Sequence, residues 1–249
     1  MFFLEKRVGE TPLEALERAR TRRHIAADLP LAYAGRLDPM ASGKILILVG
    51  EECKEQKKYH ALDKEYVVEV LLGVGSDTGD VLGLVEDGAS VFPSATEVRE
   101  VLASLVGSYD SPYPLFSSKT VKGKPLFQWA LEGENVEAPL QEGTIRSLTF
   151  CGMRRIGTDA LIRYVGKKIA TLAPVTEASK ALGRDFRKKD VLASWERIRE
   201  GRFPVVKIKV RTSAGVYMRT LAGDIGEKLG TRGLALLIKR TRIFVHGTT

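Results

Sequence analysis

Apolar and polar residues follow two different spacings along this chain, so both strands and helices are expected. Val205–Val210 alternates apolar and charged side chains, which is typical of a half-exposed strand. Glu65–Gly73 is rich in β-branched and aromatic residues and is also expected to form a strand. Val91–Val106 has apolar residues three and four positions apart, which predicts a helix. The order of these elements is irregular, which favours a mixed α+β fold over strict β-α-β repetition.

The helix expected over residues 11–23 has the clearest start. Thr11, Pro12 and Glu14 occupy the N-cap, N1 and N3 positions of a capping box. The C-terminal residues 234–245 are expected to form a strand, or a helix followed by a strand. The other expected strands are 1–7, Ile45–Val49, Val81–Glu86, Thr144–Phe150 and Ala160–Val165, and the other expected helices are Glu51–Leu62, Leu126–Leu131, 191–198 and Thr220–Leu229.

The composition is that of a globular protein, with 44% hydrophobic and 28% charged residues among 249. No apolar stretch approaches the roughly 20 residues of a membrane-spanning helix. The N-terminus lacks a signal-peptide core, so neither a membrane partner nor secretion is expected. Cys53 and Cys151 are too few for a disulfide framework, which favours the reducing cytoplasm. The three histidines are scattered without metal-ligand spacing, so no metal site is expected.

The formal net charge of +8 favours a polyanionic partner, because Lys and Arg side chains that neutralise phosphates release counterions. The alternative is a basic protein with no role in nucleic-acid binding. The densest basic region is 163–190, which is expected to be an insertion whose surface contacts RNA or is merely solvated. The candidates for RNA contact within it are Lys167, Lys168, Arg184 and Lys188.

Residues 33–44, Tyr-Ala-Gly-Arg-Leu-Asp-Pro-Met-Ala-Ser-Gly-Lys, place one carboxylate, that of Asp38, between two glycines and ahead of an apolar run. Pro39 disfavours the helical conformation at Asp38, so this residue is expected to be extended within a loop. Two interpretations are open. The segment is either a polar turn in which Asp38 bonds backbone amides, or a rigid mount for a functional carboxylate.

Motifs for nucleotide cofactors are missing from the sequence. No Gly-x-Gly-x-x-Gly follows an expected strand, and there is no Gly-Lys-Ser/Thr phosphate loop. No nucleophile elbow marks a catalytic serine. We therefore expect no cofactor.

The segment Gly35–Gly43 is similar to the pattern Gly-x-Leu-Asp-Pro-x-Ala-Thr/Ser-Gly. Four further segments match the same family in order, namely Lys6–Pro12, Lys64–Asp80, Ser117–Leu126 and Ser213–Ala222. Together they resemble the TruB family of tRNA pseudouridine synthases. The resemblance implies the pseudouridine synthase catalytic fold, an α+β fold with a mainly antiparallel mixed central sheet, flanking helices and loops, and a central active-site cleft.

The resemblance implies that Asp38 is the essential catalytic carboxylate and that Arg219 pairs with it. It implies that Tyr66 stacks on the target uracil or acts as a base toward it. The reaction would be isomerisation of uridine 55 in the tRNA T-loop, without metal or cofactor, after the base is flipped out of its stack. The residues expected to bind the substrate are Tyr33, Tyr217, Ile238 and Lys6.

Two positions depart from the family pattern. Tyr33 stands where the family has a histidine, and Arg7 stands where it has a proline. We expect residues 1–249 to form one catalytic domain without the C-terminal RNA-binding (PUA-type) domain of many relatives. It would act on the T-arm of tRNA as a monomer, with no obligate protein partner.

Two other functions stay open. One is a catalytically inactive tRNA-binding chaperone, and the other is an RNA-guided relative that acts on ribosomal RNA. The sharpest structural expectation is that Asp38 and Arg219 meet in one cleft beside Tyr66.

Overall fold

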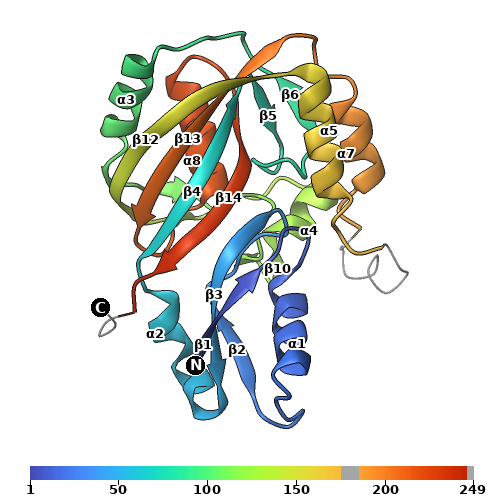
Figure 1. The fold of residues 1–249 in the computed structure, drawn as a ribbon, viewed down its shortest axis with the longest axis vertical. Helices are drawn as coiled ribbons and strands as arrows, with labels where there is room; N and C mark the ends of the chain where they lie inside the picture. The colour runs from blue at the N-terminus through green and yellow to red at the C-terminus, as the bar shows by residue number, and fades with distance from the viewer. Residues whose placement is uncertain (175–184, 246–249) are drawn as a thin grey trace.

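An eight-stranded sheet forms the centre of the computed structural model, which describes residues 1–174 and 185–245 (Figure 1). The long strands follow β-branched and aliphatic sequence, as β4 and β13 show. The strands of this sheet are β1 (Phe2–Lys6), β2 (Leu31–Ala34), β3 (Ala41–Val49), β4 (Lys64–Leu72), β7 (Gly107–Ser108), β12 (Thr144–Gly157), β13 (Arg202–Thr212) and β14 (Gly233–Ile243).

The strand order is β1-β3-β14-β4-β13-β12-β7, and β2 pairs with residues 46–49 of β3. Only the pairing between β14 and β3 is parallel in this sheet, and all its other pairings are antiparallel. The expected mixed, mainly antiparallel α+β fold is therefore confirmed. The parallel contact joins the N-terminal strands to the C-terminal strand, across almost the whole length of the chain.

The alternation along the central strands gives the sheet two different faces. On β13, Lys207 and Lys209 are exposed, whereas Ile208 and Val210 are buried. Tyr66 on β4 lies opposite Val210 in the register, so both side chains share the inner face. The inner face therefore carries the core, and Tyr66 lies at its edge.

Two helices, α3 (Ala95–Ser104) and α8 (Met218–Lys228), pack against this sheet, α3 on β12 and α8 mainly on β14 and β4. Helix α1 (Pro12–Arg22) begins with the expected capping box between Thr11 and Glu14. On the opposite side of the molecule from α3, helices α5 and α7 pack against each other (Figure 1). The remaining helices are η1 (Gly50–Glu55), α2 (Gln56–His60), α4 (Leu126–Leu131), α5 (Thr158–Ile169) and α7 (Lys188–Trp195).

Three short two-stranded sheets complete the described part of the chain. They pair β5 (Val74–Ser76) with β6 (Val85–Asp87), β8 (Ser111–Pro112) with β11 (Leu140–Gln141), and β9 (Thr120–Val121) with β10 (Lys124–Pro125).

Some expected elements were wrong. Ala160–Val165 is part of helix α5 rather than a strand, because Leu161, Val165 and Ile169 recur at helical spacing and are buried together. Residues 81–84 lie in turns ahead of β6, so the strand expected over Val81–Glu86 is mostly absent.

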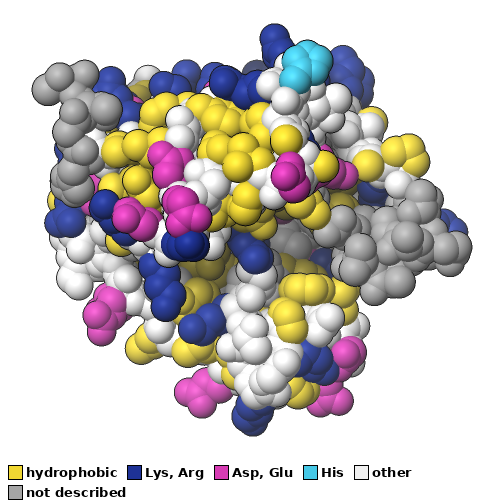
Figure 2. Space-filling view, turned by 90° about the horizontal axis from the view of Figure 1, so that it is seen from below, with side chains coloured by type: hydrophobic (Ala, Val, Ile, Leu, Met, Phe, Trp, Pro, Cys, Tyr) yellow, Lys and Arg dark blue, Asp and Glu magenta, His cyan; other side chains and the backbone are white. Residues whose placement is uncertain are grey.

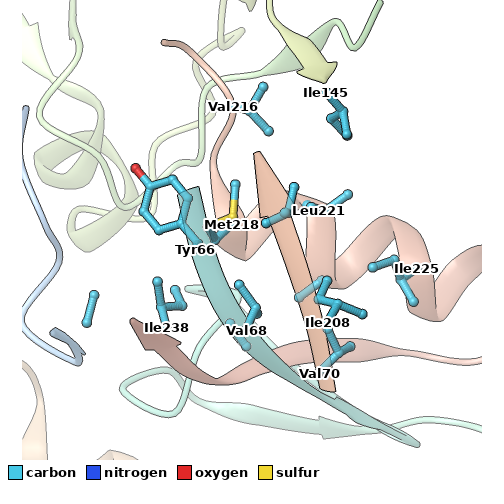
Figure 3. Close-up of a cluster of buried hydrophobic side chains, with 14 of the residues drawn as sticks. Tyr66, Val68, Val70, Ile145, Ile208, Val216, Met218, Leu221, Ile225 and Ile238 are labelled. Carbon is cyan, nitrogen blue, oxygen red and sulfur yellow. The ribbon is translucent and has the colours of Figure 1, made fainter. Parts of the chain in front are cut away.

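The largest hydrophobic cluster fills the inner face between the sheet and α8. Val68, Ile208 and Leu221 lie deep in it, whereas Tyr66 and Ile238 lie side by side at its edge (Figure 3). The Tyr66 ring points its hydroxyl away from the apolar side chains. The edge of this core therefore presents an aromatic ring and an aliphatic side chain toward the loop that carries Asp38.

Candidate active site

The loop that carries Asp38 joins β2 to β3. Its backbone is bonded at Asp38 and directly after it, since the Ala41 amide donates to the Asp38 carbonyl (3.0 Å) and the Gly9 amide donates to the Pro39 carbonyl (2.9 Å). The Asp38 side chain is 37% exposed. The loop thus holds one carboxylate at the surface on a bonded backbone.

Arg219 lies in the first turn of α8 and its side chain is only 4% exposed. It donates to Asp38 through two nitrogens, Nε to Oδ2 at 2.8 Å and Nη2 to Oδ1 at 3.3 Å. The two residues are 181 positions apart in the chain, and the contact expected from the sequence is present. The Asp38 side chain therefore forms a bidentate ion pair, which argues against the interpretation of this segment as a polar turn.

Two further bonds of the Arg219 guanidinium go to carbonyl oxygens, those of Thr78 (2.7 Å) and Phe116 (3.2 Å). Gly79 allows the close approach of these segments, because a Cβ at this position would lie 3.1 Å from the Arg219 Cβ, at a φ of +75°. Since every one of these bonds constrains the guanidinium, Asp38 is oriented by a group that is itself fixed.

A second carboxylate, that of Asp80, lies buried near the same guanidinium. Burial raises the pKa of Asp80, although the Arg219 charge opposes that effect. Burial alone would lower the pKa of Arg219, but the carboxylates of Asp38 and Asp80 outweigh it and raise that pKa. The Asp80 Oδ1 accepts from the Leu82 amide (2.9 Å) and the Thr78 hydroxyl (2.9 Å). Arg219 therefore stays cationic and serves two carboxylates.

Tyr66 and Ile238 form the apolar wall of the site. Tyr66 is 8% exposed and Ile238 is 5% exposed, and both belong to the buried cluster that also contains Leu37 and Met218. This wall offers a flat, preformed surface of the kind that stacks on a base.

Tyr217 immediately precedes α8 as its N-cap residue. Its ring meets that of Tyr113 edge to face, with centroids 5.8 Å apart. Burial, together with the neighbouring charge of Asp38, raises the pKa of Tyr217 to about 12. Tyr217 is therefore a neutral hydroxyl near Asp38 at physiological pH.

The structure places two predicted substrate-binding residues differently from the others. Lys6 is completely buried, and its ammonium donates to the carbonyls of Pro39 (3.3 Å), Ala41 (2.6 Å) and Arg7 (2.8 Å). It thus supports the Asp38 loop from beneath. Tyr33 lies on β2, partly buried against the core, and its carbonyl accepts from Gln56.

The candidates for RNA contact also differ among themselves. Lys167 is exposed on α5, whereas the Lys168 ammonium donates to the Leu236 carbonyl at 2.7 Å. The Lys188 ammonium donates to the carbonyls of Leu172 and Ala173. Arg184 lies outside the described residues. Around a recess seen from below, Lys and Arg side chains gather with acidic ones between them (Figure 2).

The sequence motifs indicated no role for Asp80 or Arg240. Asp80 follows Thr78-Gly79 and precedes Val81-Leu82, and a carboxylate directly ahead of two apolar residues signals burial. Arg240 lies two residues after the buried Ile238 on β14, and residues two apart in a strand share a face, so the spacing indicates an inward-facing arginine. The available signals were thus the alternation within the strand for Arg240 and the adjacent apolar residues for Asp80.

Within residues 1–174 and 185–245, no three His, Cys, Asp or Glu side chains gather to hold a metal ion. In the same residues, every helix is too short or too polar to cross a membrane. What the site offers instead is a partly exposed carboxylate, a buried guanidinium and an aromatic wall. Such a set can act as a nucleophile or stabilise a cation next to a stacked ring.

Residues 23–168 match the family model described as TruB family pseudouridylate synthase (N terminal domain). The match covers more than half of the chain. The chain belongs to the TruB family. Asp38 and Tyr66 both lie within the matched residues.

Other TruB family members are similar along almost the whole chain. A protein named tRNA pseudouridine synthase B from Aromatoleum aromaticum is 30% identical over 243 residues, which is 98% of this chain and 62% of that protein. Proteins of the same name from Burkholderia pseudomallei (30% identity, 98% and 64%) and Caldicellulosiruptor saccharolyticus (25% identity, 97% and 66%) are also similar. The chain thus spans slightly less than two thirds of these relatives' length.

Solved structures with the TruB family fold include the crystal structure of a Cbf5-Nop10-Gar1 complex. The likeness has a TM-score of 0.54 at 17% identity and covers 97% of this chain and 48% of that one. The structure of an H/ACA RNP bound to a substrate RNA gives a TM-score of 0.51 at 14% identity, over 97% and 47% of the two chains. At these identities the likeness establishes the pseudouridine synthase fold.

Proposed function

We propose that this protein is a pseudouridine synthase whose target is uridine 55 in the T-loop of tRNA. One observation carries the proposal. The partly exposed Asp38 carboxylate is held by two nitrogens of the buried Arg219 beside the Tyr66 wall. Membership of the TruB family supports the same conclusion.

The chemistry fits these groups. Isomerisation breaks the bond between uracil N1 and the sugar C1′, turns the base, and forms a bond between C5 and C1′. N1 gains a proton and C5 loses one, so atoms and electrons balance without an oxidant or a reductant. An anion next to the sugar assists cleavage at C1′, and the isomerisation also needs a route for one proton.

Asp38 supplies the anion. Its carboxylate acts as a nucleophile, as a base or as a stabiliser of positive charge that develops on the sugar. The Arg219 guanidinium fixes the direction of both oxygens, which avoids reorganisation during the reaction. Because Asp38 is 37% exposed, the carboxylate remains accessible to a ligand while it is paired.

Tyr66 and Ile238 receive the base. A uridine stacked within an RNA loop is flipped out before any chemistry at C1′, and an aromatic ring compensates for the lost stacking. The Tyr66 hydroxyl points away from the apolar side chains of the core. This hydroxyl is the candidate for accepting the C5 proton.

We further propose that the chain acts as one catalytic domain on the T-arm of tRNA, in the cytoplasm, without guide RNA or a protein partner. The relatives' shared name, tRNA pseudouridine synthase B, supports tRNA as the substrate class. The exposed cations of α5, including Lys167, are the proposed contacts to RNA phosphates.

The test is tritium release from RNA labelled at C5 of uridine, because product formation expels that hydrogen. The protein alone should release tritium from full tRNA and from an isolated T-arm hairpin. A hairpin in which uridine 55 is replaced by cytidine should release none. Binding without release would favour the tRNA chaperone, and release that depends on added guide RNA would favour the RNA-guided alternative.

A further inference from the structure

An arginine faces inward on β14. Arg240 is 1% exposed and has no carboxylate partner in the described residues. Its guanidinium instead donates to three backbone carbonyls, those of Lys44 (Nε, 2.6 Å), Gly35 (Nη2, 3.1 Å) and Arg36 (Nη1, 3.3 Å). All three belong to the segment that carries Asp38.

Burying a guanidinium against neutral acceptors has a cost. Desolvation of the charge is repaid only where the geometry is good, and an apolar residue of similar volume often stabilises a fold as well or better. What a guanidinium adds is a rigid planar fork with several directed donors. The position is therefore best explained by the direction of its bonds rather than by the filling of space.

These bonds join both ends of the Asp38 loop. Gly35 and Arg36 precede Asp38, whereas Lys44 follows it within β3. One planar group thus fixes the separation between the entry and the exit of the loop.

The backbone of Arg240 pairs with the start of β3, directly after the Asp38 loop. Arg240 pairs with Gly43 in the parallel register of β14 and β3. A Cβ at Gly43 would lie 2.2 Å from the Arg240 carbonyl oxygen, at a φ of +111°. Ile238, two residues earlier on the strand, belongs to the apolar wall of the site. The strand therefore sets the loop and the wall relative to each other.

We infer that Arg240 is a positioning residue, whose guanidinium fixes both ends of the Asp38 loop so that the carboxylate meets Arg219 in the reactive geometry. This inference rests on the proposed pseudouridine synthase activity. Lys6 holds the Pro39 and Ala41 carbonyls independently. Loss of the Arg240 bonds should therefore shift the loop without releasing it.

The experiment compares Arg240→Lys and Arg240→Met with Arg242→Met, an exposed arginine on the same strand. Tritium release gives kcat and KM, and amide exchange of the Ala41 N–H, which donates to the Asp38 carbonyl, reports on the loop. Arg240→Met should lower kcat on the order of 10²-fold, as a displacement of about 1 Å does. KM should change less than about twofold. Amide exchange at Ala41 should accelerate in Arg240→Met. Arg240→Lys should give values of kcat and exchange between those of wild type and Arg240→Met. Arg242→Met should match wild type in both.

A folded Arg240 variant with wild-type kcat would overturn the inference, as would a lower kcat with unchanged exchange at Ala41. If Arg240→Met does not fold, Arg240→Lys decides by the same two readouts. If neither folds, the residue serves global stability and the inference fails. A wild-type protein that releases no tritium would instead overturn the proposed activity, while the exchange comparison would still report whether Arg240 fixes the loop.

Discussion

At the scale of single residues, the site is a chain of charges in which each member is fixed by the next. Asp38 is oriented by Arg219, and Arg219 is held by two carbonyls, with the charge of the Asp80 carboxylate raising its pKa. Only the outermost member, Asp38, is substantially exposed. The buried members supply orientation, and the exposed member is left for the chemistry.

Tyr66→Phe separates the ring from the hydroxyl at this scale. Stacking should persist because the ring is kept, so KM should change little, while loss of proton transfer should lower kcat on the order of 10²-fold. Tritium release under saturating RNA measures the effect. Tyr164→Phe, at a partly buried tyrosine on α5, is the matched control. An unchanged rate in Tyr66→Phe would remove the proposed role of the hydroxyl.

At the scale of elements, the sequence predicted well where a pattern was long and regular. β4, β13 and α8 were expected within a few residues of their observed bounds, because each buries one face over eight residues or more. The helix α5 was mistaken for a strand because the window Ala160–Val165 is too short to distinguish the two periods.

The site was partly predictable for a related reason. Asp38 and Arg219 belong to contiguous motifs, so each was identified from its neighbours. Lys6 and Arg240 act on backbone carbonyls that are distant in sequence, and such acceptors carry no side-chain signature. A run of four polar residues, Lys239-Arg240-Thr241-Arg242, also hid the inward position of Arg240 within β14.

Lys168 on α5, whose ammonium donates to the Leu236 carbonyl of β14, predicts a pH effect. Burial lowers the pKa of Lys168 from 10.5 to about 8, although Asp80 and Glu69 oppose this. From about pH 8 to 10.5 the unfolded chain keeps a proton that the folded protein has released, so this lysine's contribution to the free energy of unfolding rises with pH. Wild type should gain stability over Lys168→Met across that window, by at most about 1.4 kcal/mol per pH unit.

Urea denaturation at a series of pH values measures this difference. The unpaired Leu236 carbonyl in Lys168→Met adds an offset that does not vary with pH. Lys167→Met, at the exposed neighbouring lysine, should run parallel to wild type. Parallel curves for Lys168→Met would show that Lys168 keeps its ordinary pKa.

At the scale of the whole molecule, the site forms where the N-terminal strands meet the rest of the sheet. β14 pairs with β3 on one side and β4 on the other, which brings the Asp38 loop and Tyr66 to the two sides of one strand (Figure 1). The chain's net charge of +8 favours a polyanionic partner.

Lys167→Glu tests whether the α5 surface contributes to tRNA binding. The substitution should weaken affinity and reduce the slope of log K against log salt by roughly one, as expected for one lost phosphate contact. Lys207→Glu is the control, because this exposed lysine lies on the outer face of the sheet, whereas Tyr66 lies on the inner face. Equal effects of the two substitutions on affinity, or no effect of either, would indicate that the α5 surface is only solvated and does not contact tRNA.

The central claim is that Asp38 performs the chemistry. Its most direct test is single-turnover tritium release from uridine-labelled tRNA by wild type and Asp38→Asn, with tRNA affinity measured in parallel. Asparagine keeps the shape of the side chain and removes the negative charge. We predict no release by Asp38→Asn, with affinity within about twofold of wild type. Release by Asp38→Asn at a rate near that of wild type would contradict the account.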